Sequence, residues 1–281
     1  MYEKLEQLTD FHCTLGECPT WDERTRQLYF VDIPSKAYYA MNYASGAITK
    51  TTVDEMLGCM ALCENGDVLL GMESGVFRRT ADGVVLPAHP PTVLKGARFN
   101  DGKIGVDGTF YVGTAGSRGE AAFYRLDDGK LEMLFDGCSC SNGLDWTEDG
   151  STMFYCDTLE HRVERFDVID GKPANRRTVL ELPKENGWPD GMTIDRAGRL
   201  WLALWNGYGV VCIDPVERKI LRRIDLPIKQ VTSCAFAGED LRDLIITTAA
   251  QGQDLDKQPQ AGYVFRVRCD VPGYPTRRYA K

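Results

Sequence analysis

Short apolar runs recur along the chain at nearly regular intervals. Six of them begin at Leu28, Val68, Phe110, Met153, Leu200 and Leu244, so successive starts lie 40 to 47 residues apart. Most follow a turn dipeptide such as Asp107-Gly108 or Asp149-Gly150, and each is followed by a second β-rich segment. Short apolar runs bounded by turns of this kind predict β-hairpins.

Further extended segments flank each hairpin, for example ECPTW and SNGLDW before it and KLEMLF and ILRRIDL behind it. Each repeat therefore contains about four strands. Six four-stranded units at this period predict an all-β fold, a six-bladed β-propeller. Because an open ring would leave an unpaired edge, we expect the N-terminal LEQLTDF to complete the blade made mainly by the C-terminus. No linker-like composition interrupts the pattern, so residues 1–281 are predicted to form a single domain.

Polar residues recur at one place in the predicted innermost strands. Eight positions before the turn glycine stand Asn100, Asn142 and Asp190 in three repeats, and the same count in the second repeat reaches Gly58. Glu17 occupies the matching place in the first repeat. Since the innermost strands surround one channel, the radial arrangement is expected to gather these side chains at one mouth.

Two carboxylates and two amide carbonyls form an oxygen-rich site, which suits a hard divalent cation. Asp190 lies between a proline and a glycine where a buried strand begins, and burying its charge without a partner would be costly. The residue types favour Ca²⁺, Mg²⁺ or Mn²⁺ and do not exclude Zn²⁺. The alternative is that the Asn-Gly and Asp-Gly pairs only form turns. The register shared by three repeats favours the cation site.

Composition and net charge limit the classes of molecule that the protein is expected to bind. The chain of 281 residues has a formal net charge of -8 and a pI near 5.1, without the basic stripe of a nucleic-acid-binding protein. MYEKLEQLTDF does not resemble a signal peptide, and no run reaches membrane-spanning length. We therefore expect a cytoplasmic protein with small-molecule or cation partners, no nucleic acid, no membrane, and a monomeric or weakly homo-oligomeric state. The ten cysteines are expected to be mostly reduced and buried.

Several longer motifs resemble the regucalcin family, also called the senescence-marker-protein, gluconolactonase and luciferin-regenerating-enzyme family. They cover nearly the whole chain: GECPTW and LYFVDIPSK within 16–36, RFNDGK at 98–103, SNGLDW at 141–146, PDGMTID and LWLALWNG within 189–207, and TSCAF at 232–236. The resemblance implies a six-bladed propeller with one divalent metal that hydrolyses lactones of aldonic acids. It also implies metal ligands at Glu17, Asn142 and Asp190, and substrate-binding residues at Arg98 and Asn100.

The sequence departs from that family in one loop. Similar family members carry a longer loop after the third apolar run, with a glutamate that contacts the substrate. Here the segment is only GTAGSRGEAAFY, and the shortened loop 114–122 contains Glu120 without an unambiguous register. The role of Glu120 and the identity of the sugar therefore stay open.

The resemblance predicts a metal-dependent lactonase acting on an aldonolactone such as gluconolactone. The metal would polarise the carbonyl or lower the pKa of a bound water, and the residues do not choose between these. Asp190 is expected to act as both ligand and general base.

Other chemistries lack support in the sequence. There is no G-x-S-x-G motif, and His12, His89 and His161 lie outside the starts of the innermost strands. The tryptophans are expected to pack within blades. Trp188, a neighbour of Asp190, is the best candidate among them for stacking against a sugar. Two alternatives remain: a non-catalytic calcium-binding regulatory protein that uses the same site, and a propeller scaffold for protein partners.

Overall fold

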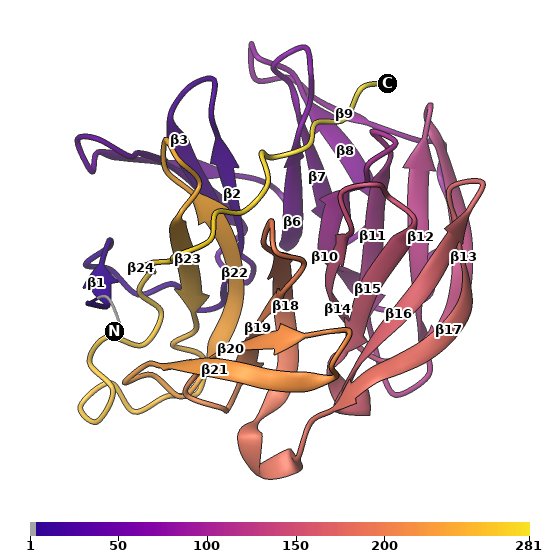
Figure 1. Cartoon of the computed structure of the whole chain (residues 1–281). Helices are drawn as coiled ribbons and strands as arrows, with labels where there is room; N and C mark the ends of the chain where they lie inside the picture. Colours follow the sequence, from indigo (N-terminus) through magenta and orange to yellow (C-terminus); the bar gives the residue numbers. More distant parts are fainter. Residues whose placement is uncertain (1–3) are drawn as a thin grey trace.

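Residues 4–281, which the computed structural model describes, form 24 β-strands arranged in six four-stranded antiparallel sheets (Figure 1). The predicted all-β, six-bladed propeller is confirmed. Two single-turn 3₁₀ helices, η1 (Thr158–Glu160) and η2 (Lys184–Asn186), interrupt the strands. Among the described residues, no helix is long and apolar enough to cross a membrane.

Each blade begins with an innermost strand at the channel and ends with an outermost strand at the surface. From the channel outward, blades 1 to 3 consist of β2 (Gly16–Asp22), β3 (Gln27–Asp32), β4 (Ala37–Asn42) and β5 (Ile48–Thr52); β6 (Leu57–Leu62), β7 (Val68–Met72), β8 (Val76–Arg79) and β9 (Val85–Pro87); and β10 (Arg98–Ile104), β11 (Phe110–Ala115), β12 (Ala121–Asp127) and β13 (Lys130–Cys138).

Blades 4 to 6 have the same arrangement. They consist of β14 (Ser141–Trp146), β15 (Thr152–Asp157), β16 (Arg162–Ile169) and β17 (Lys172–Glu181); β18 (Trp188–Ile194), β19 (Leu200–Trp205), β20 (Gly209–Asp214) and β21 (Lys219–Asp225); and β22 (Val231–Ala237), β23 (Asp243–Thr248), β24 (Phe265–Arg268) and β1 (Glu6–Gln7). The six apolar runs of the sequence are the second strands.

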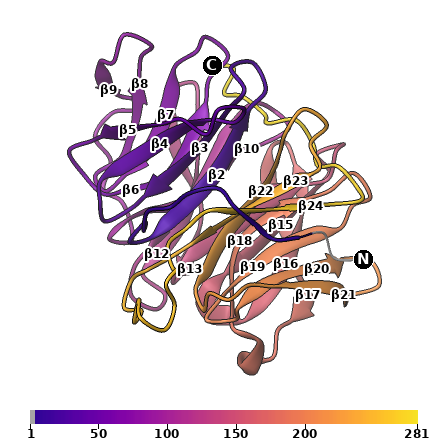
Figure 2. The same cartoon turned by 90° about the vertical axis from the view of Figure 1, so that its left-hand side faces the viewer.

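The ring closes in two ways. Each innermost strand contacts the innermost strand of the next blade, and β22 of the last blade contacts β2 of the first. In addition, Glu6 and Gln7 of β1 pair with Arg266 and Phe265 of β24, so the N-terminus supplies the outer strand of the last blade (Figure 2). The predicted closure is confirmed, and it removes the free edge that an open ring would expose.

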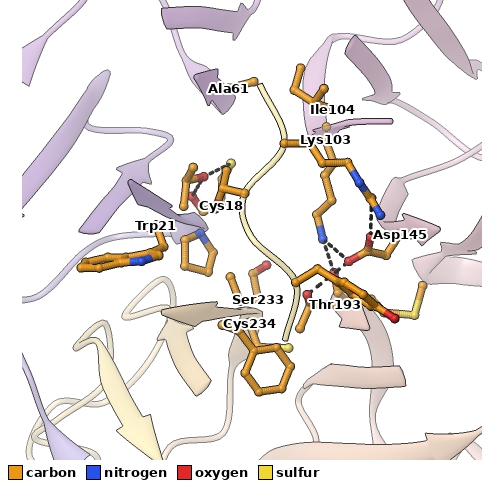
Figure 3. Close-up of a pocket in the computed structure, with 18 of the residues that line it drawn as sticks. Cys18, Trp21, Ala61, Lys103, Ile104, Asp145, Thr193, Ser233 and Cys234 are labelled. Atoms are coloured by element: carbon orange, nitrogen blue, oxygen red, sulfur yellow. Dashed lines mark hydrogen bonds and ion pairs between the residues drawn. The ribbon is translucent and has the colours of Figure 1, made fainter. Parts of the chain in front are cut away.

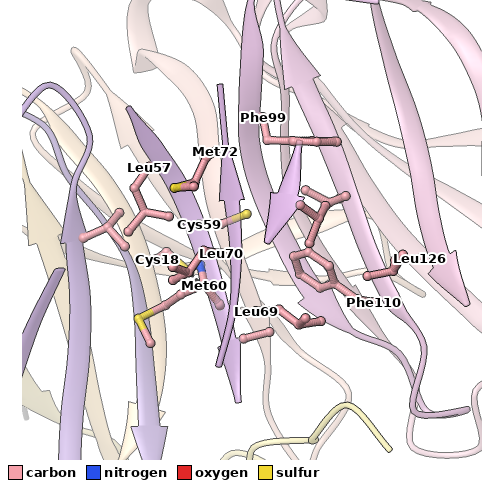
Figure 4. Packing of buried hydrophobic residues seen from close by; sticks show 14 of the residues in the cluster. Cys18, Leu57, Cys59, Met60, Leu69, Leu70, Met72, Phe99, Phe110 and Leu126 are labelled. Atoms are coloured by element: carbon pink, nitrogen blue, oxygen red, sulfur yellow. Dashed lines mark hydrogen bonds between the residues drawn. The ribbon is translucent and has the colours of Figure 1, made fainter. Parts of the chain in front are cut away.

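The core lies between neighbouring blades, where apolar side chains of adjacent sheets interdigitate. Figure 4 shows one such cluster, in which Leu57 and Met72 of blade 2 face Phe99 and Phe110 of blade 3. All ten cysteines are free, and nine of them are buried. Several bond a neighbouring blade; for example, Cys234 Sγ donates to Trp201 O at 3.2 Å. Small buried thiols thus serve here as packing groups.

The last nine residues, 273–281, which we call the C-terminal strap, cross one end of the channel (Figure 1). The strap touches several blades in turn. Gly273 bridges to Asp195 of blade 5, Arg278 pairs with Asp22 of blade 1, Tyr279 bridges to Cys63 at the end of blade 2, and Lys281 pairs with Asp127 of blade 3. The sequence pattern contains no indication of it, since it forms no strand.

Candidate metal centre

A β-bulge interrupts the innermost strand of each blade, and the predicted site residues lie at these bulges. In blades 3, 4 and 5 the ladder breaks after Phe99, Ser141 and Pro189. The next residues are Asn100, Asn142 and Asp190. A bulge re-aims the side chain of the extra residue, so one local device, repeated around the ring, directs these side chains inward.

Glu17 occupies the corresponding place in blade 1, one residue before the bulge. Gly16 pairs with Asp32 as Ser141 pairs with Asp157, and the register shifts directly after Glu17. Blade 2 has Gly58 at its bulge because there is no room for a side chain. A Cβ on Gly58 would lie 2.2 Å from Phe99 O of blade 3.

The four side chains predicted to gather at the channel mouth are buried, with 4 to 7% of their surfaces exposed: Glu17, Asn100, Asn142 and Asp190. Two of them keep an oxygen without any hydrogen-bond partner, namely Asn142 Oδ1 and Asp190 Oδ1. Buried acceptors left unpaired are rare, and each requires an explanation such as a bound ion or water. Asn142 and Asp190 lie on the neighbouring innermost strands β14 and β18, and a Cβ added to Gly143 would lie 2.5 Å from Asp190 O. Two lone acceptors side by side fit a bound cation.

Asn100 differs from Asn142 in this respect. Its Oδ1 accepts a hydrogen bond of 2.7 Å from Arg98 Nη1, and its Nδ2 donates to Ser141 O at 2.9 Å. Both polar atoms are therefore occupied. The half-buried Arg98 also donates to Phe99 O at 2.9 Å, which fixes its guanidinium beside the site. The structure thus separates an Arg98–Asn100 pair from the three residues Glu17, Asn142 and Asp190.

The carboxyl groups of the site are strained electrostatically without a cation. Burial, reinforced by the charge of Asp101, raises the pKa of Glu17 to about 8. Burial and the charge of Glu17 raise the pKa of Asp190 well above its usual range. Arg98 and the backbone N–H of Cys18 oppose the shift of Glu17 without cancelling it. Two buried carboxyls that cannot both ionise alone will ionise together when a dication lies between them.

The donor set also depends on the amide. Among residues 4–281, no three His, Cys, Asp or Glu side chains are grouped so that they could hold a metal. A cation at this place therefore needs the amide oxygen of Asn142 beside the carboxylates of Glu17 and Asp190. An all-oxygen set of this kind suits a hard divalent ion.

The opposite end of the channel contains a cavity of about 90 Å³ beneath the C-terminal strap. Figure 3 shows Lys103 bonded to Asp145 there, at 2.9 Å, with Cys18 and Ser233 across the cavity. Arg277 of the strap lies 3.4 Å from the same carboxylate. Burial alone would raise the pKa of Asp145, but these cations lower it below its ordinary value. Lys103 and Arg277 therefore neutralise the buried carboxylate of Asp145 at this end. The carboxyls of Glu17 and Asp190 have no such partner within the described chain.

Other residues singled out from the sequence lie around the entrance or in the core. Trp21, Trp146 and Trp201 are buried, as expected, whereas Trp188 is partly exposed and meets His161 edge to face. His161 is partly exposed, but its Nδ1 atom is buried without a hydrogen-bond partner among the described residues.

The remaining histidines and Glu120 are less informative. His12 bonds Ala261 O, and His89 accepts from Val76 N. Glu120 is exposed and ends a tight turn whose N–H bond returns to Ser117 O. Its role stays a prediction.

The thiols near the site are poor nucleophiles. Burial raises the pKa of Cys18 and of Cys140 to about 12 and that of Cys138 to about 11. They therefore stay protonated at neutral pH, and the thiolate is the reactive form. The prediction of mostly reduced and buried cysteines agrees with this environment.

Comparison with known proteins now identifies the family. The profile described as "SMP-30/Gluconolactonase/LRE-like region" matches residues 15–250. The chain belongs to this family. Its match covers blades 1 to 5 and the two inner strands of blade 6, β22 and β23, including all the residues of the candidate metal centre.

Relatives within the SMP-30/gluconolactonase/LRE-like family span the full chain. Regucalcin of Oryctolagus cuniculus is 35% identical over 294 residues, covering 99% of this chain and 98% of that protein. A calcium-binding protein, regucalcin, from Agrobacterium tumefaciens superposes with a TM-score of 0.94 at 27% identity, covering 99% and 98% of the two chains. A luciferin-regenerating enzyme gives a TM-score of 0.88 at 28% identity, covering 99% of this chain and all of that one.

Proposed function

We propose that the protein is a divalent-cation-dependent lactonase that opens lactones of aldonic acids to the free acids. The observation that carries the proposal is the pair of unpartnered buried oxygens, Asn142 Oδ1 and Asp190 Oδ1, beside the buried carboxyl of Glu17. Burying polar and charged groups without a hydrogen-bond or ionic partner is costly, so a bound ion is the expected partner. Membership of the SMP-30/gluconolactonase/LRE-like family supports lactone hydrolysis as the activity that this group serves.

Glu17, Asn142 and Asp190 would hold the cation. When bound, it would supply Lewis-acid polarisation of the lactone carbonyl or acidification of a water. Two carboxylates balance the charge of one dication. Because the pKa values of Glu17 and Asp190 are raised, a bound cation would stabilise the ionised form of both groups. Ca²⁺, Mg²⁺, Mn²⁺ and Zn²⁺ all accept oxygen ligands.

Asp190 is the proposed general base. Lactone hydrolysis breaks one O–H bond of water and the ring acyl C–O bond, and forms a carboxylic acid and a hydroxyl group. Asp190 takes the proton from the attacking water and returns it to the departing ring oxygen, so the base is regenerated. The product acid then ionises in solution and releases one proton. The buried position of Asp190 keeps bulk water from competing for this proton.

Arg98 and Asn100 are the proposed substrate-binding residues. Their mutual bond of 2.7 Å fixes the guanidinium next to the site, and the remaining guanidinium N–H groups can donate to sugar hydroxyls. A polyhydroxylated lactone presents several such acceptors, whereas a simple aliphatic lactone does not. This arrangement supports an aldonolactone as substrate.

A panel of lactones crossed with metals tests the proposal. Chelator-treated protein is reloaded with Ca²⁺, Mg²⁺, Mn²⁺ or Zn²⁺ and incubated with glucono-, galactono-, xylono- and arabinono-lactones while proton release is followed. We expect metal-dependent release above the spontaneous rate for at least one lactone. Metal binding without any such release would instead support a non-catalytic calcium-binding protein, an alternative favoured by the regucalcin described as calcium-binding.

A further inference from the structure

The amide of Asn142 must be oriented before it can serve as a ligand. A carboxylate presents oxygen on both sides, but an amide presents oxygen on one side and a hydrogen-bond donor on the other. Asn142 Nδ2 donates to Thr158 Oγ1 at 3.0 Å, whereas Asn142 Oδ1 has no partner. The hydroxyl of Thr158 therefore decides which end of the amide faces the carboxyls of Glu17 and Asp190.

Thr158 is itself held in place by the end of β15. Its N–H donates to Cys140 O at 3.0 Å. The preceding carboxylate, that of Asp157, accepts from Ser139 N at 2.7 Å and from Cys140 N at 3.0 Å. These bonds attach η1 to the segment that leads into Asn142. The hydroxyl is thus pre-organised and does not belong to a mobile loop.

The hydroxyl of Thr158 accepts from Asn142 Nδ2 inside the protein. Thr158 is 8% exposed, so water competes little for this bond.

The same short segment also supports the second ligand. Cys156, two residues before Thr158, donates its S–H to Asp190 O at 3.2 Å. One segment at the end of β15 therefore contacts both Asn142 of blade 4 and Asp190 of blade 5. A shift of this segment would change the separation of the two unpartnered oxygens.

Blade 1 offers an internal comparison. Asp32 occupies the place of Asp157, and it accepts from Thr14 N and Leu15 N, both at 3.0 Å. The ligand that follows, Glu17, receives only the N–H of Cys18 at 3.1 Å. In blade 1, Asp32 accepts from backbone N–H groups as Asp157 does in blade 4, but no hydroxyl of the described residues bonds the side chain of Glu17. The difference follows the chemistry, because the carboxylate of Glu17 needs no choice between oxygen and nitrogen.

We propose that Thr158 is a positioning residue of the metal centre, which fixes Asn142 with its amide oxygen toward the cation. The inference rests on the proposed cation site at Glu17, Asn142 and Asp190. Thr158 touches neither the cation nor the substrate. It acts through Asn142, as hydrogen-bonded partners of metal ligands commonly do.

Calorimetric titration of chelator-treated protein with Ca²⁺, Mn²⁺ and Zn²⁺ tests the proposal in Thr158→Val and Thr158→Ser variants. Valine keeps the shape and removes the hydroxyl, while serine keeps the hydroxyl. We expect Thr158→Val to weaken binding about 10- to 100-fold. Thr158→Ser should stay within about 3-fold of the unsubstituted protein. The melting temperature without metal, a readout of structural damage, should differ little between the two variants.

The outcomes distinguish the role of Thr158 from the existence of the metal site. Equal cation affinity of folded Thr158→Val and unsubstituted protein overturns the role of Thr158 and leaves the proposed metal site intact. Failure of the unsubstituted protein to bind any of the three cations overturns the proposed function and the inference together. Should Thr158→Val not fold, Thr158→Ala carries the same test, and failure of both to fold assigns Thr158 to the core of blade 4 and refutes the positioning role.

Discussion

Burial and, after it, the negative charge of Glu17 on β2 raise the pKa of Asp190 on β18, although the two residues lie in different blades. The propeller brings them together at the bulges of their innermost strands. Neither carboxyl forms an ion pair with a lysine or arginine of the described chain. At neutral pH the metal-free pair therefore keeps at least one proton, and a cation must compete with it.

Cation binding should release protons near pH 7. Glu17 has a pKa of about 8 and Asp190 is raised further by burial, so loading the site displaces protons that the metal-free pair retains. The apparent affinity should rise with pH until the pair is ionised, by roughly tenfold per pH unit for each proton displaced. Calorimetry in two buffers of different ionisation enthalpy measures the number released.

Glu17→Gln provides the control for this measurement. It keeps an oxygen ligand but has no proton to lose, so it should release fewer protons and bind the cation more weakly. Binding enthalpies of the unsubstituted protein that are the same in both buffers would contradict the shifted pKa values.

The metal-free protein should become less stable as pH rises. The pKa of Glu17 is about 8 in the folded chain against 4.5 ordinarily, so between these values the folded state binds more protons than the unfolded chain. The contribution of Glu17 to the free energy of unfolding is therefore present below about pH 4.5 and is lost as pH rises through about 8. Chemical denaturation with a chelator present, at steps between pH 5 and 8.5, measures this loss.

The comparison with Glu17→Gln isolates the effect, because glutamine does not titrate. The variant should show a flatter pH profile and a higher metal-free stability at pH 8. Identical slopes for the two proteins would mean that other groups cause the dependence.

The propeller could be predicted because its signal is local and repeated. Each blade carries its own apolar run and turn, as Leu200 and Gly198 do in blade 5, so hydrophobic periodicity suffices. The candidate site was also accessible, because Asn142 and Asp190 share one register relative to their turns. Radial symmetry converts that shared register into proximity.

Individual side-chain contacts could not be predicted in the same way. Thr158 looks like an ordinary residue after a strand, and only the folded chain places its hydroxyl against Asn142. The C-terminal strap forms no strand, so no period reveals that Arg277 reaches Asp145 of blade 4. Nor does the sequence show that Asn100 Oδ1 is taken by Arg98. These contacts depend on side-chain positions that no sequence period specifies.

Asp190→Asn should separate chemistry from cation binding. The amide keeps one oxygen ligand but can no longer accept a proton from water, so we expect kcat for lactone hydrolysis to fall about 10² to 10⁴-fold. Cation binding should weaken less than in Asp190→Ala, which removes the ligand as well. Proton-release assays at saturating metal, with circular dichroism to verify folding, give the comparison. Full activity in folded Asp190→Asn would refute the general-base role.

The C-terminal strap should contribute to the stability of the ring through Arg278. Arg278 and Asp22 form an ion pair whose two side chains are each only 7% exposed. Arg278→Ala removes a charged hydrogen bond from this pair, while Arg24 N and Thr25 Oγ1 still donate to Asp22. We therefore expect a loss of about 1–3 kcal/mol in the free energy of unfolding, measured by chemical denaturation.

Arg26→Ala is the matched control, since Arg26 pairs with Glu239 where both side chains are mostly exposed, at 68% and 77%. Exposed pairs contribute little, so its cost should stay below about 1 kcal/mol. The strap lies at the end of the channel away from Asp190, and Arg278→Ala should therefore leave cation affinity unchanged. If the two substitutions cost the same, the strap does not fasten blade 1 through this pair. A loss of cation affinity in folded Arg278→Ala would instead show that the strap controls the geometry of the ligands.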